Sequence, residues 1–151
     1  MAQKIKVVVL EDEFLIQDLM QGLLQDEGFE PLLAGTIQQA REHIEQALGQ
    51  GEKVGLLADN ALANEEFGWP FAAGLHERLE GRVILTSGSP PKDMAPYSKM
   101  LFMQKPFDTS RFSKAANEVF MKGFDSSAPG PGEPKNRAGG VSVSARRYQA
   151  A

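Results

Sequence analysis

The stretch VVVLEDE at residues 7–13 decides the fold, because an uninterrupted apolar run changes abruptly into three acidic residues. A β-branched apolar run without polar alternation is typical of a strand that is buried on both faces of a parallel sheet. Beyond the acids, apolar residues recur every three or four positions as far as Gly28. This spacing predicts an amphipathic helix over 12–27 that ends at the glycine.

The alternation of strand and helix continues to residue 122. Four further apolar segments predict strands at 29–34, 54–58, 83–86 and 101–104. A capping box at 36–39 starts a second helix, a third starts near Pro70, and Asp108 or Thr109 caps the last one. Five short strands separated by helices predict an α/β fold, a doubly wound five-stranded parallel sheet that helices cover on both faces.

One crossover breaks this pattern. The segment between Thr86 and Leu101 contains Pro90, Pro91 and Pro96, where a fourth helix is expected. Proline inside a helix costs about 3 kcal/mol. We therefore expect helix four to be short, irregular or absent.

Composition divides the chain into a body at 1–122 and a tail at 123–151. In the tail, 17 of 29 residues are Gly, Pro, Ser or Ala, which predicts a flexible extension. The body carries 12 basic and 18 acidic residues, whereas the tail carries 4 and 2. The tail is interpreted as a solubilising extension, with docking of Arg146 and Arg147 on a partner or on the acidic body as the alternative.

The overall composition excludes several classes of function. With a net charge of −4 in 151 residues, the chain has no cationic field for nucleic acid. It contains no cysteine and two histidines, which excludes disulfides, thiol nucleophiles and cysteine-ligated or histidine-rich metal sites. The first apolar run is too short for a signal peptide or a membrane span, so a cytoplasmic location without membrane contact is expected.

Polar side chains follow four of the five predicted strands. Glu11 and Asp12 come after the first, Asp59 after the third, Thr86 at the end of the fourth and Lys105 after the fifth. In a doubly wound sheet, ligands bind outside the carboxyl ends of the strands. Carboxylates suit Mg²⁺, and a lysine and a hydroxyl suit phosphoryl oxygens. The sequence therefore predicts a site for a divalent cation and a phosphoryl group.

Each of these features also has a purely structural explanation. Acids favour a helix N-terminus, Asp59 and Asn60 suit a turn, and Lys105 precedes a proline that ends a strand. Phe102 is equally well explained as core filler. The joint occurrence of these residues at four strand ends favours the functional interpretation.

Four motifs together resemble a two-component response-regulator receiver domain over about residues 4–122. They are VVVLEDE at 7–13, GLLADNAL at 55–62, VILTSG at 83–88 and FMQKPF at 102–107. The resemblance implies the flavodoxin-like receiver fold with strand order 2-1-3-4-5. It also implies that Asp59 accepts a phosphoryl group from a histidine kinase or a histidine phosphotransfer protein.

The resemblance assigns a role to each site residue. It implies that Glu11, Asp12, Asp59 and the backbone carbonyl of Ala61 bind Mg²⁺. Thr86 and Lys105 would contact the phosphoryl oxygens, and Phe102 falls at the aromatic switch position. These residues serve the chain's own phosphorylation, so an enzyme acting on other substrates is not expected.

The sequence departs from the usual receiver pattern at two places, which limits the family properties that the resemblance implies for this chain. Ala63 stands where the family usually has a proline, and DNALANEEFGWP at 59–70 resembles an alphaproteobacterial subgroup. No output domain follows, so a stand-alone receiver in a phosphorelay is expected, a monomer or weak dimer that signals through a downstream protein target. The proline-rich segment puts the usual dimer mode in doubt.

Three other functions are alternatives to a phosphorylated receiver. A degenerate receiver that binds partners without phosphorylation is the main alternative. A nucleotide- or flavin-binding module lacks the expected glycine motifs, and an aspartyl phosphatase lacks a second acid at Ala61.

Overall fold

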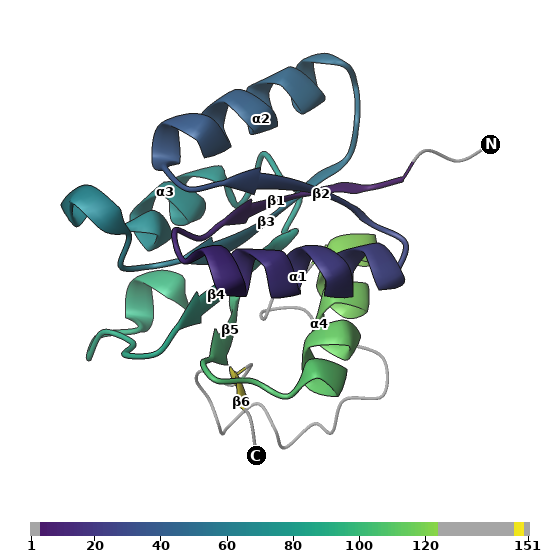
Figure 1. The fold of residues 1–151 in the computed structure, drawn as a ribbon. Helices are drawn as coiled ribbons and strands as arrows, with labels where there is room; N and C mark the ends of the chain where they lie inside the picture. Colours follow the sequence, from purple (N-terminus) through teal and green to yellow (C-terminus); the bar gives the residue numbers. More distant parts are fainter. Residues whose placement is uncertain (1–3, 124–146, 150–151) are drawn as a thin grey trace.

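A parallel sheet with the strand order β2-β1-β3-β4-β5-β6 forms the centre of the computed structural model, which describes residues 4–123 and 147–149 (Figure 1). The strands are β1 (Lys6–Leu10), β2 (Glu30–Ala34), β3 (Val54–Asp59), β4 (Val83–Ser87), β5 (Leu101–Gln104) and β6 (Arg147–Gln149). The helices are α1 (Phe14–Asp26), α2 (Ile37–Gly49), α3 (Gly68–Leu75) and α4 (Thr109–Lys122), with short 3₁₀ helices η1 (Ala63–Glu65) and η2 (Ala95–Tyr97). The five predicted strands are confirmed in the order 2-1-3-4-5.

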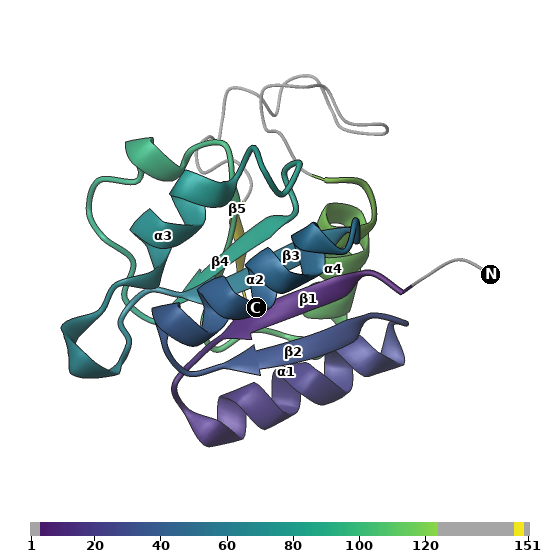
Figure 2. The same cartoon turned by 90° about the horizontal axis from the view of Figure 1, so that it is seen from above.

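Helices cover the sheet on both faces, as predicted. On one face α1 and α4 pack through Met20 and Phe112 against strand residues such as Val9. On the other face α2 and α3 pack through Ile44 and Trp69, and Figure 2 shows α2 crossing over β1 and β3. The central strand β3 is buried along its whole length, because both of its faces lie under helices.

Side-chain caps fix the starts of two helices where the sequence predicts them. Thr36 accepts a hydrogen bond from the Gln39 amide at 3.1 Å, and the Gln39 side chain accepts one from the amide of Gly35 at 2.8 Å. Asp108 accepts from the amides of Ser110 and Arg111 at the start of α4. These bonds satisfy amides that the first helical turn leaves without partners.

The first helix starts later than predicted. It begins at Phe14, because a side-chain oxygen of Glu11 accepts a hydrogen bond from the Glu13 amide at 3.0 Å and keeps residues 11–13 outside the helix. The acids therefore lie in the loop after β1 and not in the first helical turn.

The crossover between β4 and β5 contains no α-helix within the fully described residues 88–100. Its regular structure is η2, whose second residue is Pro96. The prediction of a short or irregular helix in this crossover is confirmed. The physical reason is that three prolines interrupt the segment.

The strand β6 was not predicted from the sequence. Arg147–Gln149 pair in parallel with Phe102–Gln104 of β5 and extend the sheet to six strands. Three residues of the predicted tail thus belong to the sheet. Residues 124–146 and 150–151 lie outside the described residues, so the prediction of a flexible extension there stays a prediction.

Candidate functional site

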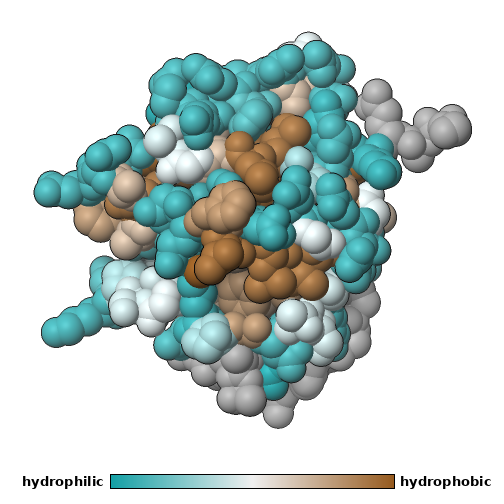
Figure 3. Space-filling model, in the orientation of Figure 1, coloured by the Kyte–Doolittle hydropathy of each residue, from teal (hydrophilic) through white to brown (hydrophobic). Residues whose placement is uncertain are grey.

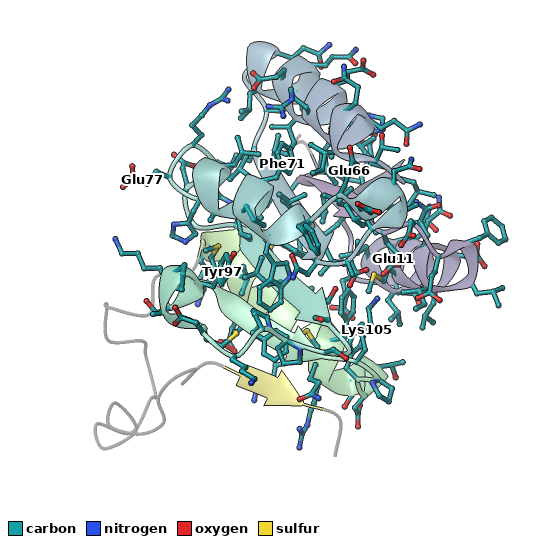
Figure 4. All side chains as sticks on the ribbon, turned by 90° about the vertical axis from the view of Figure 1, so that its left-hand side faces the viewer. Glu11, Glu66, Phe71, Glu77, Tyr97 and Lys105 are labelled. Atoms are coloured by element: carbon teal, nitrogen blue, oxygen red, sulfur yellow. The ribbon has the colours of Figure 1, made fainter. Side chains whose placement is uncertain are left out.

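The carboxyl ends of β1, β3, β4 and β5 lie at one edge of the sheet, because these strands are all parallel. Glu11 follows β1, and the register places Asp59 of β3 directly beside Thr86 of β4. Lys105 follows β5, and Figure 4 shows it near Glu11 at this end of the molecule. The structure thus brings the predicted side chains together.

Three carboxylates gather at this edge. Glu11, Asp12 and Asp59 each offer an oxygen atom within 4.8 Å of the others. The side chains of Glu11 and Asp59 are buried, whereas Asp12 is exposed. A set of carboxylate oxygens with one side open to water fits Mg²⁺, which prefers oxygen ligands and retains several waters.

Lys105 bridges the two buried carboxylates. Its Nζ donates to Oε1 of Glu11 at 2.7 Å and lies 3.3 Å from Oδ1 of Asp59. Burial lowers the pKa of Lys105, but the contacts with Glu11 and Asp59 outweigh it and raise the pKa above its usual value. The lysine is therefore a fixed positive charge at neutral pH.

The single ammonium does not balance the acids around it. Burial raises the pKa of both Glu11 and Asp59, and the hydrogen bond and charge of Lys105 offset this only in part. The neighbouring acids add to the effect, since Asp59 raises the pKa of Glu11 and Asp12 raises that of Asp59. A divalent cation bound here would relieve this repulsion.

The hydroxyl of Thr86 has no hydrogen-bond partner among the described residues, although its side chain is fully buried. A buried hydroxyl without a hydrogen-bond partner is unfavourable, so native structures rarely contain one without a reason. The neighbour of Thr86 in the sheet is Asp59. An oxygen-bearing group attached to Asp59 would offer this hydroxyl an acceptor.

Trp69 connects Thr86 to the aromatic side chains packed beneath the site, and no role for it was predicted from the sequence. Its indole N–H donates to the Thr86 carbonyl at 3.1 Å, and its amide donates to the side chain of Asn60 at 3.2 Å. Its ring meets those of Phe102 and Tyr97 edge to face, with centroids 5.4 and 5.1 Å apart. The feature of the sequence that could have pointed to Trp69 is that it is the only tryptophan of the chain and follows Asp59 by ten residues.

Phe102 is buried in the core beneath Trp69. The core-filler interpretation therefore describes its position correctly. Phe102 contacts Trp69, whose indole binds the Thr86 carbonyl, so one residue separates Phe102 from the site. Its role as the aromatic switch stays a prediction.

Comparison with solved structures places this geometry in a known fold. A response regulator from Thermotoga maritima aligns over 80% of this chain and all of its own, with a TM-score of 0.63 and 17% identity. The receiver domain of PhyR from Erythrobacter litoralis aligns over 85% and 96% (TM-score 0.66, 20% identity). The beryllofluoride-activated NtrC4 receiver domain aligns over 77% and 96% (TM-score 0.64, 25% identity).

The chain has the response-regulator receiver fold. No protein-family model and no curated protein sequence matches it. Within the described part of the chain, no helix has the length and apolar character needed to span a membrane.

The loop after β3 of this receiver fold closes back onto Asp59. The Gly68 amide donates to the Asn60 carbonyl at 2.8 Å, and Ala61 forms an isolated bridge with Phe67. A Cβ on Gly68 would lie 2.2 Å from the Asp59 carbonyl oxygen, so only glycine fits this approach. Gly68 was not predicted from the sequence, because its role depends on a contact nine residues back along the chain. The role of the Ala61 carbonyl as a metal ligand stays a prediction.

Proposed function

We propose that this chain is a response-regulator receiver that accepts a phosphoryl group on Asp59 from a histidine kinase or a histidine phosphotransfer protein. The observation that carries the proposal is the fully buried hydroxyl of Thr86, which has no partner in the described part of the chain and belongs to the residue beside Asp59 in the sheet. Asp59 in turn contacts Lys105. This site needs an anionic oxygen acceptor, and a phosphoryl group on Asp59 supplies three such oxygens.

The hydrogen bonds favour Asp59 over Glu11 as the acceptor. Both oxygens of Glu11 are engaged, Oε1 by Lys105 and Oε2 by the amide of Glu13. In the proposed step, a carboxylate oxygen of Asp59 attacks phosphorus and a new O–P bond forms. The P–N bond of a phosphohistidine breaks, and its electron pair stays on the departing imidazole nitrogen.

The other residues stabilise charge in this step. Glu11, Asp12, Asp59 and the Ala61 carbonyl would hold Mg²⁺, which when bound supplies positive charge near the transferred group. The Lys105 ammonium offers a second positive charge to the phosphoryl oxygens. The Thr86 hydroxyl donates a hydrogen bond to one of them, which satisfies its hydrogen-bonding capacity.

The surface next to the site supports a protein as phosphoryl donor. Figure 3 shows apolar side chains gathered on the face that α1 occupies in Figure 1. Phe14, Leu15 and Leu19 of α1 are 74%, 79% and 49% exposed, and the first two follow the acidic loop directly. Exposed apolar clusters mark protein contacts. A downstream protein target would read the phosphorylated form.

The experiment is intact mass spectrometry of the full chain after incubation with acetyl phosphate, in Mg²⁺ and in EDTA. We expect the mass of one phosphoryl group in Mg²⁺ and none in EDTA. Asp59→Asn should gain nothing, whereas Asp93→Asn, which alters an exposed acid outside the cluster, should match the unmodified sequence. The proposal is wrong if Asp59→Asn gains the same mass. Binding to partners without any phosphorylation would favour the degenerate receiver instead.

A further inference from the structure

The outer edge of β5 is closed by a distant part of the same chain. Arg147, Tyr148 and Gln149 lie in parallel register beside Phe102, Met103 and Gln104. Without β6, β5 would be the last strand of the sheet, and the crossover before it supplies no α-helix to shield it. An unprotected strand edge is a template for pairing with another chain.

The register identifies which amides this edge presents. The Lys105 amide donates to the Ser87 carbonyl at 2.9 Å, so it faces β4. Backbone groups alternate in direction along a strand, so the amides of Leu101 and Met103 also face β4. Those of Phe102 and Gln104 face the outer edge. Tyr148, opposite Met103, then lies between them: its amide faces the Phe102 carbonyl, and its carbonyl faces the Gln104 amide.

Charge favours the segment that occupies this edge. Residues 123–151 carry two more basic than acidic residues, whereas residues 1–122 carry six more acidic than basic ones. The connection from β5 to β6 passes through α4, and a parallel pair needs a long crossover of this kind. The chain's own C-terminal segment is therefore opposite in net charge to the body, and the connection through α4 lets it pair in parallel with β5.

We propose that the outer edge of β5 is a docking site for an extended peptide in parallel register, and that residues Arg147–Gln149 of the same chain are its resident occupant. Another protein that adds a strand here must first displace this segment. The strand β5 also carries Phe102 and leads directly into Lys105. The proposal does not depend on phosphorylation, and its test uses none.

The test is residue-level hydrogen exchange by NMR on the full chain and on Tyr148→Pro, which removes the central amide of β6. We expect the amide of Gln104 to exchange faster in the variant, by about two- to tenfold, because the segment whose carbonyl accepts from it is released. The amides of Leu101 and Met103 face β4 and serve as internal controls, with unchanged rates. Ser144→Pro, a proline in the same tail outside β6, should leave all three unchanged.

A second arm adds a synthetic peptide of residues 140–151 to the Tyr148→Pro chain. Restored protection of the Gln104 amide supports a docking edge, and a peptide with the Tyr148→Pro change should not restore it. The proposal is overturned if this amide exchanges equally in the unmodified chain and the variant, or if the peptide does not protect it. It is also overturned if protection appears only as sedimentation shows a dimer, since the occupant is then a second copy.

Discussion

The crossovers in the half of the molecule around β1 are long, regular helices, whereas the crossovers before and after β4, in the half around β5, are short. The helices α1 and α2 have 13 residues each, but α3 has 8 and the segment between β4 and β5 contains a 3₁₀ helix of 3 residues. The first half supplies Glu11 and Asp12, and the second supplies Thr86 and Lys105. The proposed metal ligands therefore lie mainly on the part with long crossovers, and the groups that would sense the phosphoryl group lie on the part with short crossovers, where we expect local opening to be easier.

The largest expected change in the free energy of unfolding is at Gly68, where the loop after β3 meets the Asp59 backbone between the two halves. Gly68→Ala should lower the free energy of unfolding by about 2 kcal/mol, because the new Cβ would meet the Asp59 carbonyl at 2.2 Å. Gly74→Ala in the same helix has no atom within 4 Å of the new Cβ and should raise it by about 0.5–1 kcal/mol. Urea unfolding of both variants measures the difference. Equal stability of the two variants would show that the loop is not packed against Asp59.

A smaller effect is expected from the acidic cluster. Asp12→Ala removes one of three mutually repelling carboxylates, so in EDTA it should melt at or above the unmodified chain. Water screens the exposed Asp12, which limits the gain to about 1 kcal/mol. The same variant should bind Mg²⁺ weakly and phosphorylate poorly. The control is Asp18→Ala, an exposed acid on α1 outside the cluster. If Asp12→Ala melts lower in EDTA and phosphorylates normally, the cluster is not a metal site.

The smallest expected change in stability is at Thr86. Thr86→Val removes a buried hydroxyl that has no partner among the described residues, so it should stabilise the unphosphorylated chain by up to about 1 kcal/mol. The variant should still accept a phosphoryl group on Asp59 but lose the structural response, whereas Thr86→Ser should keep it. A Thr86→Val chain that is destabilised by more than 1 kcal/mol would mean that the hydroxyl is already bonded.

The sequence predicted the features that depend on local chemistry. The caps at Thr36 and Asp108, the five apolar strands and the proline-broken crossover all follow from residues close together in the chain. The predicted site residues lie together in the structure because strand ends in a parallel sheet converge, so four separate motifs pointed to one location.

The features that were missed depend on contacts between distant residues. The sequence does not show that Gly68 meets the Asp59 backbone or that Trp69 reaches Thr86, because neither follows from periodicity. Strand β6 was missed for a similar reason. Three residues in a segment rich in glycine and serine give no strand signal, and their pairing depends on the free edge of β5.

The central claim, that phosphorylation of Asp59 acts on the half around β5, is tested most directly by hydrogen exchange with and without beryllofluoride and Mg²⁺. We predict that exchange changes over residues 86–104, where Thr86 and Phe102 lie, and stays the same over α2 at Ile37–Gly49. One charge-assisted hydrogen bond to Thr86 contributes about 1.5–3 kcal/mol, enough to shift a two-state equilibrium by tenfold or more. Unchanged exchange over 86–104 under conditions where Asp59 is modified, or an equal change over α2, would contradict the account.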